Sequence, residues 1–154
     1  NGIRFHVVEA NPAAGDRTPA TTRPLVIMLH GFGSFWWSWR HQLRALSGVR
    51  AVAVDLRGYG ATPRDATGFT TPRRSAADVA AITKHIAVDA KVKPHVLGWS
   101  MGALVTTLMA QMQPELAAGV VLYGYPCRTS KTAFYSKRRA WNKKPIYSVH
   151  DAFV

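Results

Sequence analysis

The chain has 154 residues, of which 47% are hydrophobic and 18% charged, with a formal net charge of +12. This composition is typical of a globular protein, and the length suits one domain that buries about two thirds of its unfolded surface. No apolar run approaches the roughly 20 residues that cross a bilayer, so we expect no membrane span. Cys127 is the only cysteine, which excludes a disulfide framework and a thiolate metal site and favours a reducing, cytoplasmic location.

The excess of basic residues is concentrated toward the end of the chain. Residues 128–154 contain seven Lys and Arg side chains against Asp151 alone. A segment of this kind is usually a solvated surface, and that is our interpretation. Binding of a nucleic acid or an anionic membrane is the alternative, and we do not expect a nucleic acid as partner.

The first predicted element is a strand. Within residues 1–9, Ile3, Phe5 and Val7 alternate with other residues, which is typical of a half-buried strand. The Asn-Gly pair at the start is a strong hairpin-turn signal, so the chain looks cut inside a hairpin. Residues 11–24 contain three prolines and no periodicity, which predicts a loop.

A buried parallel strand is predicted next, at residues 25–29, because this continuous apolar run is typical of strands that helices cover on both faces. The sequence His-Gly-Phe-Gly follows at residues 30–33, and its glycines allow backbone N–H groups to approach a ligand, as in an oxyanion hole. We expect His30 to brace this loop. Four aromatic side chains lead into a helix that runs through Leu46, and we expect most of them to pack that helix on the sheet, with an acyl pocket as the alternative: Phe35, Trp36, Trp37 and Trp39.

The strand predicted at residues 51–54 ends in Asp-Leu-Arg-Gly-Tyr-Gly, residues 55–60. Its glycines suggest a dinucleotide loop, but Pro63 stands where the third glycine should be, so we reject a Rossmann site and expect no cofactor. Asp55 and Arg57 are interpreted as a local ion pair that anchors the turn. Residues 75–78, Ser-Ala-Ala-Asp, have the form of a capping box and predict the start of the next helix.

The motif that organises the chain lies at residues 96–104. An apolar run at 96–99 meets the pentapeptide Gly-Trp-Ser-Met-Gly, and apolar residues then continue at helical spacing to Met112. This order of strand, sharp turn and helix is what a nucleophile elbow requires. Glycine is needed at 98 and 102 because side chains there would clash where strand and helix come close, and Ser100 is expected in a strained backbone conformation above the sheet edge.

The predicted fold class is α/β with a mostly parallel, doubly wound sheet, since strands alternate with helices and residues 119–124 supply a further apolar strand. Sites in such sheets lie beyond the carboxyl ends of the strands, where Ser100 and the loop at 30–33 both fall. No strand-length apolar run follows Cys127. We therefore expect the strand at 120–124 to form an open edge through which the chain self-associates.

Three motifs together resemble the α/β-hydrolase family over residues 1–126, about the first half of such a domain. Residues 30–33 are similar to the oxyanion loop of the family, residues 55–60 to its D-x-R-G-x-G turn, and residues 98–102 to its elbow. The resemblance implies a sheet of α/β-hydrolase type without its late strands. It also implies that residues 127–154 are the start of a lid or a ragged terminus.

The resemblance further implies a set of site residues. Ser100 is expected as the nucleophile, with the backbone N–H groups of Phe32 and Met101 as oxyanion donors. The residues that support this site are His30, Gly31, Gly33, Gly98 and Gly102. No metal is expected, because no histidine shows metal-ligand spacing, and His41 and His85 are interpreted as solvated helix residues.

Two features depart from the family pattern. The flanking sequence is similar to the branch of epoxide hydrolases and haloalkane dehalogenases, which carry aspartate at the elbow, whereas this chain carries Ser100. Serine chemistry proceeds through an acyl-enzyme, which favours an ester, thioester, lactone or amide substrate. The only histidine after Ser100 is His150, and neither Glu115 nor Asp151 suits the chain order of serine, acid, histidine.

The sequence therefore predicts a serine hydrolase for a small-molecule acyl substrate that lacks the acid and base of its triad and is inactive alone. The alternative is a non-catalytic hydrolase fold that acts as a binding module through its basic tail. Steep salt dependence of binding would favour the second interpretation.

Overall fold

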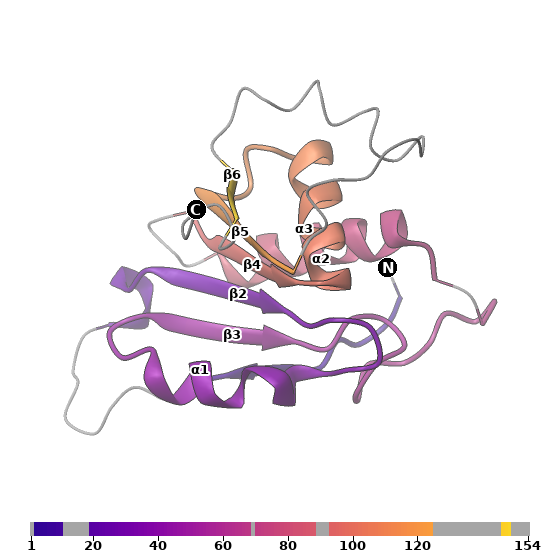
Figure 1. Ribbon diagram of the computed structural model, residues 1–154, viewed down its shortest axis with the longest axis horizontal. Coiled ribbons are helices and arrows are strands. Elements are labelled where there is room, and N and C mark those ends of the chain that lie inside the picture. The colour runs from indigo at the N-terminus through magenta and orange to yellow at the C-terminus, as the bar shows by residue number, and fades with distance from the viewer. Residues whose placement is uncertain (1, 11–18, 69, 89–92, 125–145, 149–154) are drawn as a thin grey trace.

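Strands and helices alternate along the chain in the computed structural model, which describes residues 2–10, 19–68, 70–88, 93–124 and 146–148 (Figure 1). The strands are β1 (Val7–Glu9), β2 (Leu25–Leu29), β3 (Arg50–Val54), β4 (His95–Trp99), β5 (Gly119–Tyr123) and β6 (Ile146–Ser148). The helices are the 3₁₀ turns η1 (Ala20–Thr22) and η2 (Trp36–Trp39) and the α-helices α1 (Arg40–Ala45), α2 (Pro72–Ile86) and α3 (Met101–Met112). None of the described helices is long and apolar enough to cross a membrane.

The sheet has six strands in the order β1-β3-β2-β4-β5-β6. Strand β1 is antiparallel to β3, and all the other neighbouring strands are parallel. Parallel neighbours require crossover connections, and the helix α1 lies in the one between β2 and β3, while α3 lies in the one between β4 and β5. The predicted α/β class with a mostly parallel sheet is confirmed.

Alternate residues of the central strands pack against helices on opposite faces of the sheet. On β2, Ile27 and Leu29 belong to the core that includes residues of α2 and α3, whereas Met28 belongs to the core beside α1. These three side chains are fully buried, and burial of each stabilises the fold by roughly 1.5 to 3 kcal/mol. The continuous apolar run at 25–29 therefore reflects a strand covered on both faces.

The first strand is shorter than predicted. Pairing begins only at Val7, which lies opposite Val54, and Val7 is 40% exposed instead of facing the core. Phe5 precedes the strand and packs against the core, with its ring 5.8 Å from the Arg57 guanidinium carbon. The predicted alternation was wrong because Val8, not Val7, packs against the α1 side of the sheet.

The aromatic residues before α1 divide between the core and the surface. Trp39 is buried, and Trp36 packs against the same cluster on the α1 face. Phe35 and Trp37 are exposed. The expectation that most of these rings pack the helix on the sheet therefore holds for two of the four.

The start of α2 differs from the prediction. Thr71 is the N-cap, and its hydroxyl accepts a hydrogen bond from the Arg74 N–H at 3.2 Å, while Pro72 occupies the first helical position. Residues 75–78 lie inside the helix, so the capping box predicted there was wrong. Threonine followed by proline is the stronger start signal, because proline has the φ angle of a helix and lacks an N–H that would go unpaired.

Asp78 pairs instead with Arg57. The guanidinium donates two hydrogen bonds to the two carboxylate oxygens, at 2.6 and 2.7 Å, and both side chains are buried. The predicted ion pair between Asp55 and Arg57 was therefore wrong. The two residues follow one strand, but Arg57 reaches α2, whereas Asp55 binds groups elsewhere.

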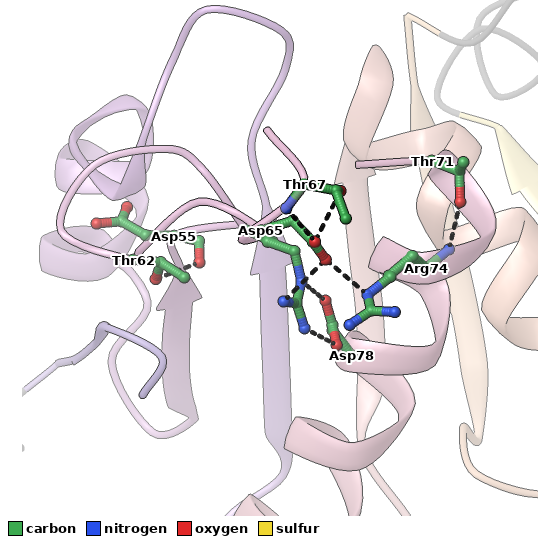
Figure 2. Close-up of polar contacts among 8 residues, drawn as sticks. Asp55, Thr62, Asp65, Thr67, Thr71, Arg74 and Asp78 are labelled. Carbon is green, nitrogen blue, oxygen red and sulfur yellow. Dashed lines mark hydrogen bonds and ion pairs between the residues drawn. The ribbon is translucent and has the colours of Figure 1, made fainter. Parts of the chain in front are cut away.

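Asp65 links the segment of residues 58–68 to the same helix. One of its oxygens lies 3.0 Å from Nε of Arg74 and 3.5 Å from Nη1 of Arg57 (Figure 2). The other accepts hydrogen bonds from the N–H and hydroxyl groups of Thr67, and these bonds lower the pKa of the Asp65 carboxyl. The ionised carboxylate therefore holds the 58–68 segment against the start of α2.

The far edge of β5 is covered where we expected it to be open. Strand β6 pairs in parallel with β5, from Val120 opposite Ile146 to Leu122 opposite Ser148. The prediction failed because it required a strand-length apolar run, whereas three residues are enough to occupy this edge. The other residues of the 127–154 segment lie outside the described residues. Self-association of the chain stays a prediction, but the open strand edge on which it was based is covered.

We expect Asp78→Asn to destabilise the fold by about 3 kcal/mol, because it removes the two short charged hydrogen bonds of a buried guanidinium and leaves it only the more distant Asp65, at 3.5 Å. Arg74→Gln is the control, since Arg74 is 54% exposed in its pair with Asp65 and a surface pair contributes at most about 1 kcal/mol. Urea titration of the variants gives both values. Equal losses for the two variants would contradict the importance of the buried pair.

Candidate active site

Ser100 occupies the turn between β4 and α3. Its backbone has φ 52° and ψ −112°, and it is the only non-glycine residue with a positive φ among the described residues. A serine in this region is strained by about 1 to 3 kcal/mol and persists only where the surrounding structure imposes it. The residue is exposed, so the turn presents its hydroxyl at the carboxyl end of β4.

Two glycines allow the close approach that imposes this turn. A Cβ at Gly98 would lie 2.4 Å from the carbonyl oxygen of Gly102, and a Cβ at Gly102 would lie 2.3 Å from that of Leu29. Both distances are far inside van der Waals contact with backbone atoms, which cannot move away cheaply. The packing of α3 on β4 and β2 therefore requires glycine at both positions.

Neighbouring segments hold Ser100 from two sides. Its N–H donates a hydrogen bond of 2.8 Å to the carbonyl oxygen of Tyr123 at the end of β5. On the β2 side, a Cβ at Gly31 would lie 3.3 Å from the Cβ of Ser100, so the loop at 30–33 runs directly beside the serine. The serine side chain does not cap α3, which leaves the hydroxyl available for a ligand.

The predicted oxyanion donors lie on the two segments that meet at Ser100. Met101 is the first residue of α3, and the first N–H groups of an α-helix have no partner within the helix and lie at the positive end of its dipole. Phe32 lies in the turn closed by the hydrogen bond from the Ser34 N–H to the Gly31 carbonyl, and Gly33 takes φ 69° there. The side chain of Phe32 is 80% exposed.

His30 is a buried part of this loop. Its Nδ1 lies 2.8 Å from the Gly31 carbonyl oxygen, and the Leu56 N–H donates to its Nε2 at 3.1 Å. The bond to Nε2 requires the neutral tautomer with the proton on Nδ1, and burial lowers the pKa of the imidazole accordingly. Both nitrogens are engaged with backbone groups, so His30 ties the 30–33 loop to the end of β3 and has no lone pair for proton transfer.

Asp55, the residue after β3, binds groups from three segments of the chain. Its carboxylate accepts hydrogen bonds from the N–H groups of Trp36, at 2.6 Å, and Ala61, at 3.0 Å, and lies 2.8 Å from Nδ1 of His6. The carboxylate also explains Gly60, where a Cβ would lie 2.0 Å from one of its oxygens. Sequence reasoning missed this role because the partners come from distant parts of the chain, although the glycine five residues later signals a close approach.

Tyr59 is a second residue that sequence reasoning missed. Its ring lies edge-on to His30, with centroids 5.2 Å apart, and to Phe32, with centroids 6.2 Å apart. Its hydroxyl donates a hydrogen bond of 3.6 Å to the sulfur of Met101. Tyr59 therefore contacts both residues that carry the predicted oxyanion donors. Its place in the Gly-Tyr-Gly sequence was the available signal.

The remaining candidates do not meet at this site in the described part of the chain. Glu115 is exposed in the turn after α3, while His150 and Asp151 lie outside the described residues, so the missing triad stays a prediction. His41 and His85 are exposed helix residues, as expected. No group of three or more His, Cys, Asp or Glu side chains in the described segments could hold a metal ion.

A strained serine between a parallel strand and the following helix, next to a glycine loop at the same sheet edge, defines a protein of the nucleophile-elbow type. The chain belongs to the α/β-hydrolase family: the model of the family described as "Alpha/beta hydrolase family" matches residues 26–149. The resemblance inferred from the three motifs is thereby confirmed.

Epoxide hydrolases are among the curated relatives of this chain. The chain is 35% identical over 148 residues to Epoxide hydrolase 4 of Homo sapiens, a match that covers 96% of this chain and 38% of the relative. It is 34% identical over 128 residues to Epoxide hydrolase B of Mycobacterium tuberculosis, covering 81% of this chain and 33% of the relative. The chain thus spans little more than a third of the length of these relatives.

Solved structures show the same fold. An epoxide hydrolase from Vigna radiata superimposes with a TM-score of 0.69 at 33% sequence identity, covering 92% of this chain and 43% of that protein. A thermophilic esterase from Thermogutta terrifontis has a TM-score of 0.68 at 24% identity, covering 90% of this chain and 46% of that protein, and at this identity it supports the fold alone.

We expect Gly102→Ala to destabilise the fold by at least about 1 to 3 kcal/mol, because the new methyl group meets the Leu29 carbonyl. Gly119→Ala is the matched control. There the nearest atom to an added Cβ is Nδ1 of the exposed His95 side chain, at 3.1 Å, and that side chain can move. Urea titration compares the two variants. A loss no larger for Gly102→Ala than for Gly119→Ala would contradict the close approach of α3 and β2.

We also expect stability to fall as the pH is lowered from 7.5 to 5.5. Burial lowers the pKa of His30 in the folded chain below its ordinary 6.5, so the unfolded chain binds the proton more readily. The stabilising contribution of neutral His30 is complete above pH 6.5 and is lost as the pH falls toward the folded-state pKa, by up to about 1.4 kcal/mol per pH unit. His30→Asn should flatten this slope in urea titrations, whereas His41→Asn, at an exposed position, should leave it unchanged. A slope equally steep in His30→Asn would assign the effect to other groups.

Proposed function

We propose that this chain carries the nucleophile and the oxyanion hole of a serine hydrolase that acts on acyl substrates. The observation that supports the proposal best is the positive φ of Ser100, a strained conformation that the fold maintains between β4 and α3. In this proposal, Ser100 is the nucleophile, and the N–H groups of Phe32 and Met101 are the oxyanion donors.

The proposed reaction begins with attack of the Ser100 hydroxyl oxygen on the substrate carbonyl carbon. A carbon–oxygen bond forms, the serine proton is released, and the carbonyl oxygen becomes an anion that the two N–H groups stabilise. Collapse of this intermediate breaks the bond to the leaving alcohol or amine, which takes up a proton. Water then hydrolyses the resulting serine ester, releasing the carboxylic acid and restoring Ser100.

The serine favours an acyl substrate over the epoxides after which the relatives are named. Opening of an epoxide by a hydroxyl oxygen would produce an ether, which water does not cleave under mild conditions, so the enzyme would remain alkylated. Attack of the same oxygen on an acyl carbon produces an ester, which water can cleave. Turnover at Ser100 therefore calls for a carboxylic ester, a thioester, a lactone or an amide.

In this proposal, the described residues position Ser100 but do not activate it. Both ring nitrogens of His30 bind backbone groups, and Nδ1 of His6 binds Asp55. A serine hydrolase without its histidine retains only the roughly 10³ to 10⁴-fold acceleration that the oxyanion hole and substrate binding provide. The proposal therefore includes slow reaction of this chain with activated esters. The competing polyanion-binding function depends on residues outside the described part, and no observation favours it.

The experiment is acetylation by p-nitrophenyl acetate, followed by peptide mapping with mass spectrometry. We expect the acetyl group on Ser100 to accumulate at least about tenfold faster than on Ser47, an exposed serine between α1 and β3, because only Ser100 has the proposed oxyanion donors. Steady turnover should remain near background. Ser100→Ala should remove the rapidly acetylated site, and Ser47→Ala should not.

Two results would count against this proposal. Equal acetylation of Ser100 and Ser47 would show that no oxyanion hole acts at the elbow. Stable alkylation of Ser100 by styrene oxide, without acetylation by the ester, would reverse the assignment of substrate class. Rapid turnover abolished by Ser100→Ala would support the nucleophile but show that a base is present in the chain.

A further inference from the structure

A cavity of about 430 Å³ lies beside the elbow, on the side where α2 and α3 cover the sheet. Phe32 and Met101, which carry the two proposed oxyanion donors, both line it. Tyr59, Thr70, Ser75 and Val105 are among the other residues around it. Its volume falls within the range of about 300 to 1,000 Å³ that is usual for small-molecule sites.

The part of the cavity next to the elbow is apolar. The ring of Tyr59 contacts Phe32, and its hydroxyl is engaged with the sulfur of Met101. Val105 lies one helical turn beyond Met101 on α3 and is buried. These side chains offer an apolar surface next to the two residues that carry the proposed oxyanion donors.

One wall of the cavity is held in place by the ion pairs already described. Arg57 and Arg64 both line the cavity; the guanidinium of Arg57 is buried and paired with Asp78, whereas Arg64 is exposed, so its charge can remain in water. Asp65 and Arg74 fasten the 58–68 segment to α2 (Figure 2). This wall is therefore preformed, which lowers the entropic cost of ordering the protein when a ligand binds.

We propose that this cavity receives the acyl arm of the substrate, and that apolar acyl groups of medium length, such as hexanoyl, fit it best; this inference rests on the proposed function. An ester has two arms, and only the acyl arm stays bonded to Ser100 after the first step. The leaving arm must depart and water must enter on another side.

The physical basis of the selectivity is burial of methylene groups. Each methylene that leaves water for an apolar wall favours the bound state by about three- to fourfold. Hexanoyl has four more methylenes than acetyl, and partial burial of these already yields a preference of at least about tenfold. A substitution that fills the cavity should remove this preference.

The test compares the rates of Ser100 acylation by p-nitrophenyl hexanoate and p-nitrophenyl acetate in the whole chain, each divided by its uncatalysed hydrolysis rate. We expect the hexanoate-to-acetate ratio to be at least about ten in the unmodified chain. Val105→Phe, which fills the cavity from α3, should lower the ratio at least fivefold. Thr70→Trp narrows the cavity from a partly exposed loop position, so it tests the same point if the buried substitution prevents folding.

Met112→Phe is the matched control, since Met112 is on the same helix, 39% exposed and not part of the cavity wall. It should leave the ratio unchanged. A ratio near one in the unmodified chain, with Ser100 still acylated, would overturn the acyl-arm assignment and leave the proposed function intact. If Val105→Phe and Thr70→Trp changed the preference among acetate esters of different alcohols instead, the cavity would hold the leaving arm. Absence of Ser100 acylation by either ester would overturn both proposals.

Discussion

The close approach of α3 to β4 and β2 is the constraint on which the rest of the site depends. Gly98 and Gly102 have no side chains, and the backbone of the helix therefore comes within a distance that no Cβ could tolerate. This contact leaves the chain too little room to turn from strand to helix in an ordinary conformation, so Ser100 takes a positive φ. The strain is balanced by the burial of α3 between the sheet and α2, where Val105 and Met109 are almost completely enclosed. The exposed serine is thus a product of core packing.

A second layer of buried polar contacts sets the loops that surround the serine. Asp55 binds N–H groups from the segments before α1 and after β3, and His30 links the glycine loop to Leu56. Because these groups bind backbone donors and acceptors, they determine the path of the loops whatever side chains the loops carry. Buried polar groups of this kind are costly when one partner is lost, because the other is left unpaired out of water. The loops at the carboxyl edge of the sheet are therefore linked to one another through these buried contacts.

The residue at the tip of the elbow bears on the substrate class that we propose. The curated relatives reported above are named as epoxide hydrolases, and the fold agrees with that of an epoxide hydrolase of known structure. The residue at the tip of the elbow is a serine, and a serine ether would be a dead end where a serine ester is an intermediate. Family membership thus rests on glycines and buried strands spread along the chain, whereas the substrate class that we propose rests on one side chain and the cavity next to it.

Local patterns in the sequence were sufficient for the central strands and for the elbow. The apolar runs of β2, β3, β4 and β5 and the spacing of glycines around Ser100 carry their own physical meaning, since burial on both faces and close backbone approach each restrict which residues fit. The partners of charged residues could not be predicted in the same way. Arg57 binds Asp78 on α2, and Asp55 binds His6, the residue before β1. Such pairs form between side chains that the fold brings together from distant positions in the sequence. Tertiary structure also decided two further features, the three-residue strand that covers the edge of β5 and the cavity that Phe32 and Val105 line. The reason is the same, because an edge or a cavity exists only between segments and no single segment encodes it.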